Sequence, residues 1–393
     1  VYKRQALGSE IMKVWRRWTR RADTTGELSW GALQGVACRS WLRDGEVFFQ
    51  HVAGREVAYP FTPRDVPYRV EMLEGDYCPR HLTMEAEGWR QGIRHNTWRM
   101  PTAYAFYLRH PGDLWDGGTA AVTFEQVKTI GAANVTHLKL AKRWPATRGT
   151  SVLAPIIQRL YDIKDLEESE RLKNRVLASW VAAITKSPDM IGQEETNDRG
   201  DRFYEAFGGT LIDTLAPGES IEGVGPDYPT TALPDHIADQ IRRVASGAGA
   251  RYSSVAKRYD GNYAAQRQEM VESEGHYQIR EDAFVQKFVR TVYERMVAVA
   301  ILDGQIALRD SNDDALERAV NAEYRGQPTP WIDPLKEVQA DAMAIEKGFA
   351  DIDQIRIKRG APAAMIGTPA PMQREPAQLS LINGDDDEEE DAA

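Results

Sequence analysis

The side chains that most often carry out chemistry in proteins are scattered along this chain of 393 residues. Its seven histidines form no HxxH or HxxxH pair, so no helix has a local metal-chelating signature. The two cysteines, Cys38 and Cys78, are too few for a zinc cluster or a disulfide framework. The GxxxxGK(S/T) loop of nucleotide-binding enzymes and the GxSxG turn of esterases are both absent. We therefore expect a protein that is not an enzyme and that needs no metal or cofactor.

One segment has side chains suited to contact with phosphate groups. Residues 251–263 contain the cations Arg251, Lys257 and Arg258 together with three tyrosines, and a turn-forming Asp-Gly-Asn run ends at Asn262. Such a composition fits weak contact with phosphates that does not depend on base sequence. The alternative is an ordinary solvated turn, and the residues alone leave both interpretations open.

The net charge of −10 comes mostly from one end of the chain. Seven consecutive acids occupy 385–391, and the remaining 52 acidic residues are nearly balanced by 49 basic ones. A block of like charges predicts a solvated, disordered tail. The alternative is an electrostatic arm that binds a basic partner or repels DNA. A protein that grips DNA tightly should be basic, so the composition disfavours a storage or regulatory DNA binder.

The apolar residues are distributed as in a protein outside membranes. No run approaches the roughly 18 apolar residues that a membrane span needs, so we expect no integral membrane protein. The low cysteine content suits a reducing cytoplasm. The chain opens with Val1 and shows no signal peptide, which predicts a processed or trimmed start.

Hydrophobic spacing indicates which elements hold these segments. It predicts helices over 9–22, with Ser9 as N-cap, and over 29–42. Residues 45–140 are rich in glycine, proline and short alternating runs, which indicate strands and turns in a mixed α+β domain.

A single long helix is predicted over 151–186. Its apolar residues, among them Leu160, Val176, Trp180 and Val181, keep helical spacing and spread around the helix. A helix of this length, with both apolar and charged faces, is either the spine of a large domain or a strut in an assembly. Further helices are expected over 233–247, about 266–302 and 331–359, the last interrupted near Gly348; a glycine- and proline-rich insert separates the first of these from the long helix.

Six segments, in order, resemble the lambda family of bacteriophage portal proteins. The most specific is RGTSVLA at 148–154, which opens the long helix directly after the strand-like run VTHLKLAKRW. The other five segments are CRSWLRDGEVFF at 38–49, YAFYLRHPGD at 104–113, TLAPGESIE at 214–222, RYSS with NYAAQRQEM within 251–270, and WIDPLKEVQA with EKGFADIDQIRIKRG within 331–360.

The resemblance implies an α+β portal fold with wing, stem, clip and crown, assembled as a ring of usually twelve subunits. It implies the following parts: the wing at 1–150, a descending stem helix at 151–186, the clip at 187–232, a returning stem helix at 233–247, the tunnel loop at 248–265, a long helix and the rest of the wing at 266–330, the crown at 331–372, and a proline/alanine-rich and acidic tail at 373–393.

The same resemblance implies a function and partners. The ring would occupy one capsid vertex of the virion, after assembly in the host cytoplasm, and would conduct double-stranded DNA during packaging and ejection. Its partners would be the terminase large subunit, head–tail adaptor or tail proteins, and the major capsid protein. Arg251, Lys257, Arg258 and Asn262 would face DNA, and Leu160, Val176, Trp180 and Val181 would lie between subunits. The main alternative is a virion structural or adaptor protein without a DNA channel.

Overall fold

A computed structural model gives the arrangement of most of the chain. The residues that it describes are 2–58, 64–113, 127–179, 183–186, 219–222, 232–259, 261–308, 313–322, 324, 326 and 334–360. The fold mixes helices and sheets, as expected, and divides into two compact units, Val1–Ala322 and Glu323–Ala393. Among the described helices, none has the length and apolar character that crossing a membrane requires.

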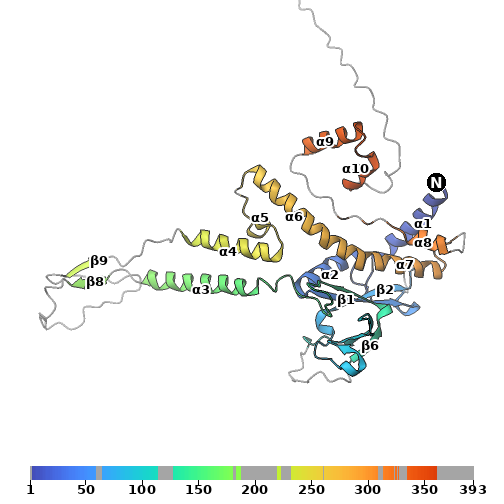
Figure 1. Cartoon of the computed structure of the whole chain (residues 1–393), viewed down its shortest axis with the longest axis horizontal. Coiled ribbons are helices and arrows are strands. Elements are labelled where there is room, and N and C mark those ends of the chain that lie inside the picture. The colour runs from blue at the N-terminus through green and yellow to red at the C-terminus, as the bar shows by residue number, and fades with distance from the viewer. Residues whose placement is uncertain are drawn as a thin grey trace, which may run out of the picture. The chain divides into compact units, whose positions relative to one another are not determined.

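The first unit contains an antiparallel sheet of three strands and another of four, which lie next to each other (Figure 1). The strands of the first sheet, in spatial order, are β2 (Tyr68–Glu74), β1 (Glu46–Ala53) and β7 (Val135–Lys139). The strands of the second are β3 (Trp89–Arg90), β4 (Ile93–His95), β5 (Pro101–Tyr107) and β6 (Val127–Gly131). Short 3₁₀ turns connect them at Arg55–Val57, Gly75–Tyr77, Glu85–Glu87 and Ala132–Asn134. The strands predicted within 45–140 are therefore confirmed.

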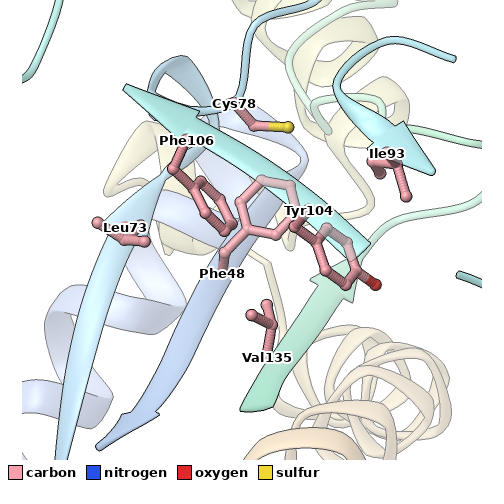
Figure 2. Packing of buried hydrophobic residues seen from close by; sticks show 7 residues of the cluster. All are labelled: Phe48, Leu73, Cys78, Ile93, Tyr104, Phe106 and Val135. Carbon is pink, nitrogen blue, oxygen red and sulfur yellow. The ribbon is translucent and has the colours of Figure 1, made fainter. Parts of the chain in front are cut away.

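The central strand β1 is buried on both faces. Phe48 points toward the second sheet and meets Phe106 edge to face, with ring centroids 5.2 Å apart. Figure 2 shows this cluster of Phe48, Leu73, Cys78, Ile93, Tyr104, Phe106 and Val135. Phe49 points the other way and stacks on Phe288, 3.7 Å between centroids. Because successive strand side chains alternate between faces, one strand joins a core between the sheets to a second core under the helices.

Two helices precede the sheets. α1 (Tyr2–Trp18) begins and ends earlier than the predicted 9–22, so Ser9 lies inside the helix and is not its N-cap. The helix ends at Trp18, and in the turn that follows Asp23 accepts a hydrogen bond from the Leu28 backbone amide. α2 (Trp30–Asp44) follows the prediction, since Ser29 caps it through the Ala32 amide.

The predicted 36-residue helix is shorter in the structure. α3 spans Ile157–Ser179; residues 151–156 form turns before it, and β8 (Ala183–Lys186) pairs with β9 (Glu219–Glu222) after it. The start is displaced because the Ser151 hydroxyl accepts from the Leu153 amide and Pro155 has no amide to donate. The end is displaced because the run from Ala183 to Lys186 pairs as a strand.

Among the remaining helices of the first unit, one lies antiparallel to α3, and others follow one another as a long helix (Figure 1). α4 (Ala232–Ala248) packs on α3, and α5 (Tyr252–Ala256) follows inside the segment predicted as a loop. α6 (Tyr263–Phe284), the π-helical turn η7 (Val285–Val289) and α7 (Arg290–Leu302) form the long helix predicted over 266–302. α8 (Asp313–Val320) packs on α7, where the Tyr293 hydroxyl reaches the Ala319 carbonyl at 3.5 Å.

The second unit contains the predicted C-terminal helix pair. α9 (Pro334–Glu346) and α10 (Ile352–Lys358) are separated at Gly348, whose φ is +71°. Arg359 closes the pair through two bonds to the Asp341 carboxylate, the shorter at 2.6 Å. The acidic tail at 373–393 lies outside the described residues, as does most of the clip segment at 187–232.

Candidate functional site

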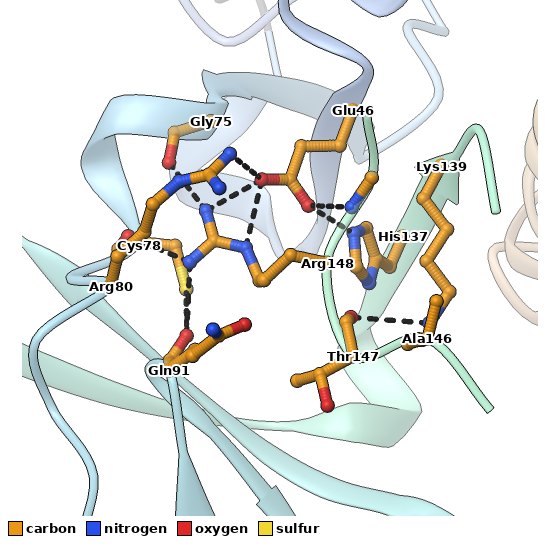
Figure 3. Close-up of polar contacts among 11 residues, drawn as sticks. Glu46, Gly75, Cys78, Arg80, Gln91, His137, Lys139, Ala146, Thr147 and Arg148 are labelled. Carbon is orange, nitrogen blue, oxygen red and sulfur yellow. Dashed lines mark hydrogen bonds and ion pairs between the residues drawn. The ribbon is translucent and has the colours of Figure 1, made fainter. Parts of the chain in front are cut away.

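The arginine of the most specific sequence motif is buried at the base of α3. Arg148 forms an ion pair with the Glu46 carboxylate, 2.7 Å between Nη2 and Oε1, and its Nε donates to the same oxygen at 2.8 Å. The guanidinium also donates to the carbonyls of Gly75, Cys78 and Gln91 at 2.8–3.0 Å (Figure 3). One side chain thus ties the first sheet to loops that lead into the second.

The residue that follows Arg148 has no room for a side chain, so it must be glycine. Gly149 donates its amide to Glu46 Oε2 at 2.9 Å, and a Cβ at Gly149 would lie 2.0 Å from the Gly45 carbonyl oxygen. Gly45 itself has a φ of +84°, and a Cβ there would lie 2.3 Å from the Thr150 carbonyl carbon. The two backbones therefore touch where β1 begins and where the chain leaves β7 for α3.

The charges in this cluster are set by burial and by the pairing. Burial by itself would raise the pKa of Glu46, but hydrogen bonds from His137 and Arg148, with the charge of Arg148, lower it to about 2. Burial lowers the pKa of His137 to about 4, although Glu46 opposes that shift. His137 is therefore neutral near pH 7 and donates from Nε2 to Glu46 Oε2 at 3.0 Å. Arg80 adds a contact to Glu46 from the exposed side, at 3.0 Å.

This arrangement is suited to holding the chain and not to reacting. Both Glu46 oxygens are occupied by donors, and burial raises the pKa of the neighbouring Cys78 thiol to about 12. A thiol with that pKa stays protonated and is a poor nucleophile. Within the described parts of the chain, no group of three metal-ligating side chains comes together either. The cluster is a structural joint between the sheets and α3.

The four residues predicted to face DNA take different places around α5. Arg251 lies directly before α5 and directs its guanidinium to α6, 3.4 Å from Glu274 and over the Tyr277 ring. Asn262 caps α6, accepting from the Ala265 amide at 2.8 Å. Lys257 ends α5 in the left-handed conformation, and the side chains of Lys257 and Arg258 are both exposed. Two of the four residues thus organise the segment, and two present charge at its surface.

Two of the four predicted interface residues lie in the described part of α3. Leu160 is on α3 and is 44% exposed in the single chain. Val176 also lies in α3, and Trp180 and Val181 fall outside the described residues. The structure thus places only Leu160 as a side chain, on the surface of α3.

Sequence reasoning missed the partners of Arg148. Glu46 and His137 are ordinary members of predicted strands, and no local pattern marks either one. One signal was available: Glu46 is a charged residue directly before the apolar run Val47, Phe48 and Phe49, where a buried strand would exclude an unpaired charge.

The sequence of this chain is similar to those of known proteins. The family model for the lambda family of phage portal proteins matches residues 2–281. The probable portal protein of Halomonas phage phiHAP-1 is 20% identical over 361 residues, which are 89% of this chain and 67% of that protein. Portal protein B of Escherichia phage lambda is 23% identical over 255 residues, 58% of this chain and 48% of that protein. The chain thus spans about two thirds and about half of these relatives.

Solved structures with similar chains come from a gene transfer agent. A chain from the virion of the native particle is 14% identical, with a TM-score of 0.44, and the match covers 90% of this chain and 84% of that one. A chain from the neck of the native particle, computed with C12 symmetry, is 15% identical, with a TM-score of 0.41 and coverage of 88% and 83%. Since the family model spans most of the residues from the first helix to the end of α6, the chain belongs to the lambda family of phage portal proteins.

Proposed function

We propose that this chain assembles into a ring of about twelve subunits around a channel for double-stranded DNA, at one vertex of a phage capsid. The observation that carries the proposal is the buried contact of Arg148 with Glu46. Arg148 stands in the most specific family motif, directly before α3, and α3 corresponds to the stem helix of the portal architecture. Portal proteins are structural, and the saturated Glu46 cluster agrees with that role.

The surface of α3 supports contact with further subunits. One side of α3 packs on α4, where the Arg159 guanidinium donates to the Gln240 side chain at 3.3 Å. Its other sides leave apolar side chains in solvent: Ile157, Leu160, Tyr161 and Leu172 are all exposed in the single chain. Exposed apolar groups distributed around a helix favour burial against neighbouring copies. Leu160, Val176, Trp180 and Val181 are the residues that we assign to this contact.

The segment between α4 and α6 is proposed to face DNA. Lys257 and Arg258 lie next to each other at its exposed end, so twelve copies would place a ring of cations around the channel axis. Arg251 and Asn262 would contribute by holding the segment in shape through Glu274 and the Ala265 amide. Contacts of this kind are weak singly and screened by salt, which sliding DNA requires.

The proposed place of the ring at a capsid vertex also suggests its protein partners. In the virion, the clip at 187–232 would meet the terminase large subunit during packaging and head–tail adaptor or tail proteins afterwards. The wing and crown would meet the major capsid protein, and assembly would take place in the host cytoplasm. β8 ends directly before the clip and pairs with β9 inside it, Ile184 opposite Ile221, which supports a clip that begins from paired strands.

A mass measurement on the purified protein tests the ring. Twelve chains of 44.2 kDa give a particle above half a megadalton, which native mass spectrometry separates from a monomer. Electron microscopy of the same sample should show a central channel. A monomer at micromolar concentration would contradict the proposal, and a compact oligomer without a channel would favour an adaptor protein.

A further inference from the structure

Two tryptophans stand almost fully in solvent around one cleft of the first unit. Trp98 is 87% exposed and Trp144 is 91% exposed. Both line a cleft of about 860 Å³ that also contains Met100, which is exposed, and Tyr104. Large aromatic side chains exposed together on a soluble protein mark surfaces that bind another molecule.

The loops that carry both tryptophans are held in place. The Asn96 side chain accepts from the backbone amides of Trp98 and Met100, each at 2.9 Å. After Trp144, the Lys139 ammonium donates to the carbonyls of Ala146 and Thr147, and Figure 3 shows this lysine reaching across to the loop. The two rings are thus presented by ordered turns, which lowers the entropy cost of binding through them.

The charge around the cleft selects an acidic partner. Its lining includes one carboxylate, Glu85, and a larger number of cations: Arg90, Arg99, Lys139 and Lys287. Arg90, Arg99 and Lys287 are exposed. A partner that fits must therefore combine apolar groups for the two indole rings with negative charge for the rim.

The same chain has a surface of that kind on α6. One side of α6 contacts the α4–α5 segment, where Arg280 donates to the Ala248 carbonyl at 3.0 Å. The opposite side carries Val271 and Ile279, which are 63% and 70% exposed, together with the exposed acids Glu272 and Asp282. These four residues recur at helical spacing and form one stripe, which we call the α6 outer face.

We propose that the tryptophan cleft binds the α6 outer face of a second copy of this chain. The two surfaces are unlike and complementary in charge, so the contact is heterologous, and repeated heterologous contacts close into a ring when the rotation permits. The inference rests on the proposed ring and adds to it the pair of surfaces that join adjacent subunits. It is separate from the α3 contact, because it uses the sheets and α6.

Charge reversal on each surface tests the pairing. The cleft variant carries Arg90→Glu and Arg99→Glu, and the helix variant carries Glu272→Lys and Asp282→Lys. Each alone should raise the concentration for half-assembly by more than about tenfold, equal to roughly 1.4 kcal/mol per interface. All four side chains are exposed, so both variants should keep the circular dichroism and melting of the parent. Reversing the exposed cations Lys13 and Arg20 is the matched control and should leave assembly unchanged.

Mixing the two variants gives the decisive result. Each cleft of one variant then matches each α6 outer face of the other, so the mixture should form rings with equal numbers of both chains. Native mass spectrometry resolves that composition, and the quadruple variant should also assemble. Trp98→Ala with Trp144→Ala should abolish assembly without changing the fold.

The outcomes separate this inference from the ring itself. If the parent protein forms no ring, the proposed function fails. If the parent forms rings and both reversed variants do so equally well, or if the mixture stays monomeric, the pairing is overturned. If the tryptophan variant assembles normally but is not incorporated into capsids, the cleft binds another virion protein and the inference is equally wrong.

Discussion

The buried contacts of Arg148 show why an arginine stands in the most specific motif of this chain. Its guanidinium serves one carboxylate and three backbone carbonyls at once, and only a planar group with five N–H donors can do so. A lysine would keep the charge but would leave carbonyls of Gly75, Cys78 or Gln91 without a donor.

We therefore expect Arg148→Lys to lower the free energy of unfolding by about 1–3 kcal/mol for each buried carbonyl that is left without a donor. Arg80→Lys is the matched control, since Arg80 binds the same Glu46 oxygen from an exposed position. It should cost no more than about 1 kcal/mol. Chemical denaturation of both variants provides the comparison. Equal losses would mean that burial of Arg148 does not matter.

The pKa values of the buried cluster predict acid sensitivity. Folding lowers the pKa of His137 to about 4 and of Glu46 to about 2, so the unfolded chain binds more protons at low pH. Stability is therefore fully present above about pH 6.5 and falls as His137 becomes protonated in the unfolded state, then falls further below about pH 4.5 through Glu46. Melting curves between pH 7 and pH 3 measure this slope. His137→Gln should flatten the upper part of it, and an unchanged slope would contradict the assignment.

At the scale of elements, the sequence predicts those helices and strands that hydrophobic spacing determines, and it misses those that individual hydrogen bonds determine. The order of elements, the strands within 45–140 and the helices at 29–42 and 233–247 could be predicted, because hydrophobic spacing determines them. The turns before α3 and the helical turn α5 could not, since Ser151 acts through a local hydrogen bond and Arg251 through contacts with α6, and hydrophobic periodicity reports neither. The Glu46–Arg148 pair is separated by about a hundred residues and leaves no local pattern.

We expect Lys257→Ala with Arg258→Ala to leave the ring intact and to reduce the amount or retention of packaged DNA. The reason is that these cations are exposed at the end of α5 and take no part in the buried core. The defect should be the same for genomes of different base composition, because phosphate contacts carry no sequence information. Lys142→Ala with Arg143→Ala removes the same charge from another exposed site and is the control. Equal packaging by all three proteins would remove the proposed role.

The exposed side of α3 leads to a second expectation. Leu160→Asp should weaken ring formation by roughly 1–3 kcal/mol per interface, because it places an unpaired charge where a neighbouring copy would bury the site. Asn174→Asp adds the same charge at another exposed position of α3 and should have little effect. Mass photometry over a dilution series measures both. The residue assignment fails if the two variants dissociate alike.

At the scale of the whole molecule, charge is concentrated in the last few residues while the rest is nearly balanced. A conduit should not hold DNA tightly, so a balanced body suits the proposed function. The tail follows the α9–α10 pair along the chain, and we expect it to act inside the capsid by repelling packaged DNA or binding a basic segment of another protein.

Deletion of 385–393 should leave oligomerisation unchanged, because seven consecutive acids cannot bury themselves against like subunits. Native mass spectrometry of the truncated and complete chains makes the comparison. A chain with the seven acids replaced by asparagine and glutamine separates the effect of charge from that of length. Loss of the ring on truncation would show that the tail is structural.

The joint at the base of α3 also has a mechanical consequence. A pull along α3 reaches the sheets at residues 148–151, where the Arg148 side chain, the Gly149 amide and the Thr150 amide all bond to the body of the unit. Bonds that share a load in parallel must rupture together, whereas bonds arranged as a zipper open one after another at lower force. Tension on the helix should therefore stretch α3 itself before it detaches the helix from the sheets.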